Sequence, residues 1–339
     1  MRHQYLERHS RRVRDERLFG DRMVNYIYSN LRESSPRLFS ALTGARMSSL
    51  LAFVNYDSLL GARLAGGQDF VRACGVDLAE CLDDPAGLDT PRKVFERRIR
   101  YWEVRPMPPE ENEVVSPSDS RLLLGSLARE SLLFLKEKFF TLPELVGEDK
   151  RRWLTAFGGG DYAIFRLTPE KYHYNHAPVS GRVVDHYAID GLYHSCNPGA
   201  VVSLAAPYSK NKRVVTIIDS DVPGGTACGL VAMVEVVALM IGEVCQAYSR
   251  DAYDDPSPVM PGMFIRRGQP KSLFRPGSST VVLLFQPGRV AFCPDLVENQ
   301  RTPGVDSRFA SGLTAPLVET EVRVRMGIGR ALPASGGLS

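Results

Sequence analysis

The segment Gly277-Ser278-Ser279-Thr280-Val281-Val282-Leu283-Leu284-Phe285 carries more information than any other part of this 339-residue chain. Residues 280–285 are apolar and rich in β-branched side chains, which predicts a buried strand. Gly277 has no Cβ, so the backbone before Ser278 is free to adopt angles that other residues avoid. Gly-Ser-Ser before a strand is most often only a turn, but a serine in this setting can also be the point where a chain cuts itself.

Such a self-cut requires a base that takes the serine proton. The Ser278 hydroxyl attacks the carbonyl carbon of Gly277 and forms an ester; elimination and hydrolysis then leave a pyruvoyl group on the new N-terminus and release ammonia. An acid and two histidines are available in Ser116-Pro117-Ser118-Asp119 and Tyr172-His173-Tyr174-Asn175-His176-Ala177-Pro178. We assign Ser278 as the nucleophile, His176 as its base and Asp119 as the group that orients His176.

Composition and charge narrow the class of protein. The chain is 44% hydrophobic and 24% charged, which is ordinary for a globular protein, and its formal net charge of +3 is too small for a bulk nucleic-acid binder. Residues 1–22 carry seven arginines against four acids. A basic start followed by an apolar helix is suited to an anionic lipid surface, and a solvated helix face is the equal alternative.

The cysteines and histidines show neither a disulfide framework nor a metal site. The six cysteines have no CxxC spacing, so we expect reduced, mostly buried thiols in a cytosolic compartment. His173 and His176 are three residues apart without further ligands nearby in sequence, so no metal is expected. We find no secretory signal, and the longest apolar stretch, residues 229–244, is interrupted by two glutamates and too short to span a membrane. Any membrane association is therefore expected to be peripheral.

The pattern of apolar residues predicts an α+β protein with two parts. Residues 1–105 are expected to form a helical, membrane-surface subdomain, residues 106–330 a larger β-rich catalytic domain, and residues 331–339 a tail. The Pro-rich residues 105–111 are the linker candidate. Strands are expected at residues 121–127, 163–167, 181–186, 201–204, 213–218, 229–237, 280–285 and 318–324, and a helix around residues 132–140.

The ordered motifs resemble the phosphatidylserine decarboxylase family over most of residues 15–330. Besides the three segments already quoted, the similar stretches are Pro36-Arg37-Leu38-Phe39, Phe95-Glu96-Arg97, Arg105-Pro106, Phe139 to Gly147, Phe165-Arg166-Leu167-Thr168-Pro169 and Asn211-Lys212-Arg213-Val214-Val215. The resemblance implies a proenzyme cleaved between Gly277 and Ser278 into two chains that stay associated. Ser278 would become a covalent pyruvoyl cofactor that serves as an electron sink when carbon dioxide leaves.

The resemblance also implies the substrate and the location. Family members convert phosphatidylserine to phosphatidylethanolamine, so the chain is expected at an anionic membrane surface, as a peripheral protein on the cytosolic face of the cell membrane. His173 aligns with the family histidine that protonates the substrate Cα after decarboxylation, so the catalytic set is Asp119, His173, His176 and Ser278. Monomer and homodimer both stay open.

Some positions depart from the family pattern, and two other functions stay open. Pro276 comes just before the predicted cleavage residues, and Ser279 is a second serine at which cleavage could occur. Ser120 and Val237 stand where family members often have glycine. A relative that decarboxylates a soluble amino acid would carry the same self-cleavage motifs. A non-catalytic binding relative is a third alternative, and the intact catalytic set argues against it.

Overall fold

The protein is described by a computed structural model that covers most of the β-rich part. The described residues are 2–18, 26–28, 34–35, 39, 42–44, 71, 75–128, 139–204, 206–238, 243–275, 279–310 and 315–332. Most of residues 19–74, within the expected helical subdomain, and most of the helix expected around residues 132–140 lie outside these ranges. Gly277 and Ser278 also lie outside them.

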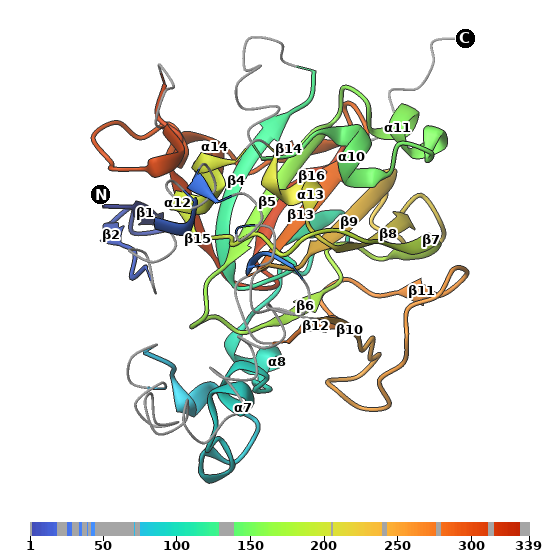
Figure 1. Cartoon of the computed structure of the whole chain (residues 1–339). Helices are drawn as coiled ribbons and strands as arrows, with labels where there is room; N and C mark the ends of the chain where they lie inside the picture. Colours follow the sequence, from blue (N-terminus) through green and yellow to red (C-terminus); the bar gives the residue numbers. More distant parts are fainter. Residues whose placement is uncertain are drawn as a thin grey trace.

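Ten strands form one sheet in the order β11-β7-β8-β9-β13-β5-β4-β15-β1-β2 (Figure 1). Neighbouring strands are antiparallel except β1 and β15, which pair in parallel. In chain order the strands are β1 Gln4–Glu7, β2 Val13–Asp15, β4 Ser120–Ser126, β5 Asp161–Leu167, β7 Gly181–Ile189, β8 Arg213–Asp219, β9 Leu230–Val236, β11 Phe264–Ile265, β13 Ser279–Phe285 and β15 Glu319–Val322.

Strand β13 lies in the middle of this sheet and is buried on both faces. It pairs with β9 on one side and with β5 on the other. Val281, Leu283 and Phe285 contribute to the core on one face, and Val282 and Leu284 to the core on the other. Because a strand without a solvent face gains from apolar side chains at successive positions, residues 281–285 form an unbroken apolar run.

Different layers cover the two faces of the sheet. The face of Val282 and Leu284 packs against four helices: α10 Leu142–Val146, α11 Arg151–Phe157, α12 Pro198–Ser203 and α13 Pro207–Lys210. The opposite face packs against α14 Pro294–Asn299 and two small sheets. One small sheet contains β10 Val244–Gln246, β12 Pro270–Phe274 and β6 Tyr174–His176, and the other contains β14 Val290–Phe292, β16 Gly327–Ala331 and β3 Glu113–Val115.

Residues 75–104 form a small lobe below the sheet in the view of Figure 1. Its elements are the 3-10 helices η3 Leu78–Glu80 and η4 Pro85–Gly87 and the short helices α7 Pro91–Phe95 and α8 Tyr101–Val104. Cys81, Leu88 and Val94 form its own small core. The short helices of this lobe agree with the helical character expected of residues 1–105, but they cover only the C-terminal part of that range.

Two sequence-based expectations are wrong. Residues 4–7 and 13–15 are strands of the main sheet, so the first part of the expected helical subdomain belongs to the β-rich domain. Residues 201–204, expected as a strand, lie at the end of α12. The side chain of Asn197 caps the N–H of Gly199 and Pro198 occupies the first turn, and this start signal outweighs the β-branched valines.

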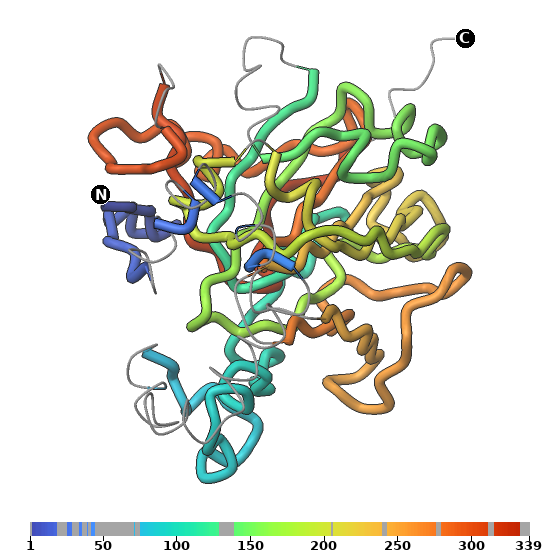
Figure 2. Tube along the Cα trace, in the orientation of Figure 1, coloured from blue at the N-terminus to red at the C-terminus, as the bar shows by residue number. Residues whose placement is uncertain are grey.

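Residues 2–18 form an N-terminal strap that binds the C-terminal part of the chain. Figure 2 shows this blue segment beside the red C-terminal residues. Arg8 donates to Asp295 at 2.7 Å and to the carbonyl of Gly327 at 2.6 Å. At the other end of the strap, Glu16 and Glu319 both pair with the buried Arg166 (2.6 Å and 2.5 Å). The strap is therefore joined to β15 by backbone pairing and by buried charge.

We expect Glu16→Gln to lower the free energy of unfolding by about 3 kcal/mol, because Arg121 and Arg166 would each lose a buried carboxylate partner. Urea unfolding followed by circular dichroism measures the change. Glu7→Gln is the matched control on the same strap, since Glu7 pairs with Arg14 in solvent, and its effect should be much smaller. Equal losses in the two variants would contradict the assigned role of the buried network.

Candidate active site

Two buried histidines lie at β6, next to the segment that leads into β13. Strand β6 pairs with β12, and the backbone N–H of Phe274 donates to the carbonyl of His173 at 3.1 Å. The predicted cleavage residues Gly277 and Ser278 follow β12 and precede Ser279, the first residue of β13. The histidine motif and the described residues on the N-terminal side of the predicted cut are thus neighbours in the fold.

His173 is fully buried and keeps one ring nitrogen unpaired. Its Nδ1 lies 2.7 Å from the carbonyl of Lys171, which can only accept, so Nδ1 carries the proton. The ring stacks on Phe95 with 3.5 Å between ring centroids. Nε2 has no hydrogen-bond partner among the described residues. Burial, with the nearby charge of Arg97, holds the pKa of His173 well below its usual value, so the ring is neutral and Nε2 offers a free lone pair.

His176 is also fully buried, but both of its nitrogens are engaged. Nδ1 donates to the carbonyl of Gly268 at 2.9 Å, and Nε2 lies 2.9 Å from the hydroxyl of Tyr172. The edge of Tyr101 packs against the ring. Burial lowers the pKa of His176 to about 3, which keeps the resting ring neutral.

Asp119 is held by an arginine. Arg105 binds it through Nε at 3.1 Å and through a terminal nitrogen at 2.8 Å, and the same arginine also binds Glu80. The backbone N–H of Val324 donates to Asp119 at 2.8 Å. Burial raises the pKa of Asp119, but the charge and hydrogen bonds of Arg105 outweigh it, so the pKa lies below its usual value and the group is a carboxylate.

The hydrogen bonds differ from the expected pairing of Asp119 with His176. The two segments do meet, because the backbone N–H of His176 donates to the carbonyl of Pro117 at 2.7 Å. In the described part of the chain, however, the ring of His176 is oriented by Gly268 and Tyr172, and Asp119 is drawn to Arg105. Burial lowers the pKa of His176; the hydrogen bond to Gly268 and the charge of Asp119 raise it, and the charges of Arg325 and Arg105 lower it further.

A buried polar network beside β6 was not identified from the sequence. Lys271 Nζ and a carboxylate oxygen of Glu235 are 2.6 Å apart, and both side chains are fully buried. Asn175, between the two histidines, donates to Glu235 at 3.1 Å, and Ser272 also bonds this carboxylate. The signal available in the sequence was Glu235 itself, since an acid within a buried apolar strand requires a partner.

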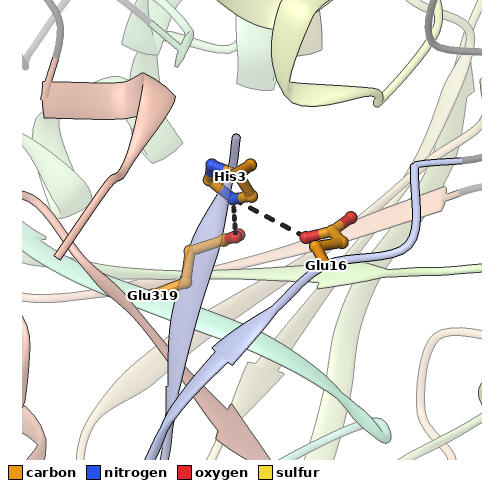
Figure 3. A group of neighbouring side chains, drawn as sticks. All are labelled: His3, Glu16 and Glu319. Carbon is orange, nitrogen blue, oxygen red and sulfur yellow. Dashed lines mark hydrogen bonds and ion pairs between the residues drawn. The ribbon is translucent and has the colours of Figure 1, made fainter. Parts of the chain in front are cut away.

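His3, Glu16 and Glu319 are the one cluster with metal-ligand chemistry among the described residues (Figure 3). His3 Nδ1 accepts from the backbone N–H of Arg308, so Nε2 carries the proton and donates to Glu319 at 2.9 Å. Arg166 pairs with both carboxylates, and Arg121 pairs with Glu16 at 2.6 Å. The donor atoms are thus already protonated or neutralised, and the cluster is an ion-pair network that fixes the N-terminal strap.

The structure also bears on the basic N-terminus. Several of its arginines have partners within the described part of the fold, among them Arg8 with Asp295, Arg11 with Glu298 and Arg14 with Glu7. Part of the positive charge expected to meet lipid is therefore neutralised internally. Of the helices in the described ranges, none combines the length and the apolar character that a membrane crossing requires.

Comparison with known proteins gives one consistent result. The family model for phosphatidylserine decarboxylase matches residues 92–327. A phosphatidylserine decarboxylase proenzyme of Anaeromyxobacter sp. (strain K) is 31% identical over 77% of this chain and 90% of its own length. The proenzyme of Chlamydia trachomatis serovar L2 is 30% identical over 91% of this chain and 95% of its own length. Proenzyme 3 of Schizosaccharomyces pombe is 29% identical over 76% of this chain and a quarter (25%) of its own length. The chain therefore belongs to the phosphatidylserine decarboxylase family.

Proposed function

We propose that the protein removes the carboxylate of phosphatidylserine with a pyruvoyl group made from Ser278 when the chain cuts itself after Gly277. The observation that carries this proposal is the pairing of β6 with β12. It brings two neutral, buried histidines beside the strand that leads to Ser278. Membership of the family and the proenzyme names of its relatives support the same activity.

The residues around the cut are suited to hold a pyruvoyl group. Two buried polar atoms in this region lack a hydrogen-bond partner among the described residues: His173 Nε2 and the hydroxyl of Ser279. Unpaired polar atoms in a buried setting are costly unless a further group meets them. When present, the pyruvoyl group supplies an electron sink for the loss of carbon dioxide. Strand β13 would fix its position, since the strand is paired on both sides.

His173 is the candidate for proton delivery. Its Nδ1 is fixed by Lys171 and its ring by Phe95, so the unpaired Nε2 has a defined direction. A neutral imidazole with a free nitrogen would take a proton from the substrate ammonium on Nε2, pass it to the substrate Cα and return to the same state. We assign this step to His173.

His176 and Asp119 are the candidates for the self-cleavage step. His176 would take the proton of the Ser278 hydroxyl, and Asp119 would stabilise the resulting positive charge from a distance. Arg105 holds Asp119 in its charged form. The role proposed for Asp119 is therefore electrostatic, in place of the direct orientation expected from the sequence.

The small lobe of residues 75–104 is the proposed contact with the membrane. Trp102 and Leu82 are large apolar residues that are 43% and 40% exposed on it. Tryptophan is suited to the lipid–water interface because its ring is apolar and its N–H is polar. A peripheral position of this kind keeps the headgroup of a two-chain lipid within reach.

Ser278→Ala should leave a single chain of 37.6 kDa, whereas the unchanged protein should yield fragments 1–277 and 278–339. The serine hydroxyl is the proposed nucleophile, and alanine has none. Denaturing gels and intact-mass measurement give the result, and Ser279→Ala is the matched control that still cleaves. If Ser278→Ala gave two fragments and Ser279→Ala gave one chain, the cleavage site would lie between Ser278 and Ser279.

His173→Gln should cleave normally but lose activity on phosphatidylserine by about 10²–10⁴-fold, the usual loss for a missing proton-transfer group. Carbon dioxide release from mixed micelles measures the activity, with free serine as the competing substrate. His186→Gln is the control, because His186 is half-buried and bonds Thr216, and it should keep its activity. Full turnover by His173→Gln would contradict the assignment of proton delivery to His173. A preference of the unchanged protein for free serine would contradict the proposal that its substrate is a lipid.

Trp102→Ala should bind anionic vesicles several-fold less tightly, because an interfacial aromatic anchor is lost. Co-sedimentation with phosphatidylserine-containing vesicles measures the binding. Val297→Ala is the control, since Val297 is also exposed (37%) but lies on α14, far from the lobe (Figure 1). Unchanged binding of Trp102→Ala would place the membrane contact elsewhere.

A further inference from the structure

Arg267 and Arg325 are neighbouring arginines that have no carboxylate partner among the described residues. Arg267 is only 8% exposed, and its guanidinium donates to the carbonyls of Glu113 at 2.9 Å and Pro108 at 3.0 Å. Arg325 is half-buried and donates to the carbonyl of Tyr101 at 3.0 Å. Its Nε is shielded from solvent and has no hydrogen-bond partner in the described part of the chain. The Arg325 guanidinium therefore keeps a buried donor that no described group accepts.

Gly268 allows the two arginines to lie close together beside the candidate active site. Arg267 is the preceding residue, and a Cβ at Gly268 would lie 3.2 Å from Arg325 Nε. The backbone of Gly268 has a φ of +75°, and its carbonyl accepts the Nδ1 proton of His176. The absence of a side chain thus leaves room for Arg325 next to the loop that orients His176.

A turn of strained backbone holds Arg325 in this place. Its φ is 71°, in the left-handed region that residues with a Cβ seldom adopt. The backbone N–H of Arg325 donates to the carbonyl of Ser116 at 2.9 Å, and that of Val324 donates to Asp119 at 2.8 Å. The guanidinium lies over the ring of Tyr101, 4.9 Å from its centroid. The fold therefore keeps an unfavourable conformation that places a cation at the site.

The positive charge of the pair is not neutralised by an ion pair. Burial lowers the pKa of Arg267 and of Arg325, and the charge of Arg267 further lowers the pKa of Arg325. Three carboxylates act on Arg267 from a distance, but within the described ranges none of them forms an ion pair with it; they belong to Glu110, Glu111 and Glu113. Because a buried charge without a partner is costly, an anion from outside the protein would be favoured here.

We propose that Arg267 and Arg325 form a binding site for the phosphodiester of a phospholipid headgroup. The two free oxygens of a phosphodiester suit the planar fork of arginine N–H groups. The location agrees with this ligand, because Arg325 donates to Tyr101 and the next residue, Trp102, is the exposed side chain proposed to meet the membrane.

The identity of the lipid as phosphatidylserine rests on the proposed function. Its phosphate would be held by Arg267 and Arg325 while its amine reaches the predicted cleavage residues. Free serine has no phosphate, so it would lack this contact. The site therefore gives the protein a means to prefer a phospholipid over a soluble amino acid.

The first experiment measures binding without any pyruvoyl group. The Ser278→Ala precursor is titrated by calorimetry with short-chain phosphatidylserine below the concentration at which it forms micelles. We expect Arg325→Gln and Arg267→Gln each to weaken binding about tenfold, because each removes charge-assisted hydrogen bonds. Arg325→Lys should lose less, since lysine keeps the charge but not the fork. Arg323→Gln is the matched control with less than about a twofold effect, because Arg323 lies on the same turn and its side chain is 60% exposed.

The control and a second probe decide against the site if it is wrong. Equal losses in Arg323→Gln and Arg325→Gln would indicate general attraction to a basic surface and would overturn the proposal. Inorganic phosphate is the second probe. If it binds and short-chain phosphatidylserine does not, the ligand is free phosphate and the lipid assignment is wrong. Arg267→Gln, on a separate segment, keeps the test valid if Arg325→Gln does not fold.

The second experiment uses the processed protein. A contact made equally in the bound substrate and in the transition state affects KM and leaves kcat unchanged. We expect Arg267→Gln to raise KM for short-chain phosphatidylserine about tenfold, and to narrow the preference for the lipid over free serine. A lower kcat with an unchanged KM would contradict a phosphate-binding role. Absence of decarboxylation by the unchanged protein would instead refute the proposed function, while binding by the precursor would still test the site.

Discussion

The pairing of β13 inside the large sheet is the constraint on which the rest of the structure depends. The strand begins at Ser279, hydrogen-bonds to β5 and β9, and buries both faces. A break in the chain just before it would not release it, because its backbone and side-chain contacts are independent of the preceding peptide. The same rigidity would give a new N-terminus formed just before the strand a fixed position. Self-processing and catalysis therefore both require that β13 stay fixed in the sheet.

Much of the fold was predictable from the sequence. The strands around residues 121–127, 163–167 and 213–218 were expected within a few residues of β4, β5 and β8, since short runs of apolar residues are typical of buried strands. Residues 4–7 were not predictable in this way. They form a strand because β15, more than 300 residues away, offers a free edge, and nothing local encodes that partner.

The site shows the same division between local and distant information. The motif around His173 and His176 was recognisable, because the residue types needed for proton transfer stand close together. The pairing of Asp119 with Arg105, and the contact of Tyr172 with Tyr253, depend on segments that meet only in the folded chain. A carboxylate pairs with the nearest strong hydrogen-bond donor. The charged guanidinium of arginine, with five N–H groups, is a stronger donor than a neutral imidazole. The local pattern therefore pointed to the candidate histidines but not to the residues that contact them.

The parallel pairing of β1 with β15 has a consequence for the order of events during synthesis. Residues 4–7 leave the ribosome long before their partner strand, residues 319–322. One edge of the sheet must then wait for a strand that is distant in the sequence, and such distant pairings form slowly. The N-terminal strap therefore cannot complete its pairing until residues 319–322 have left the ribosome.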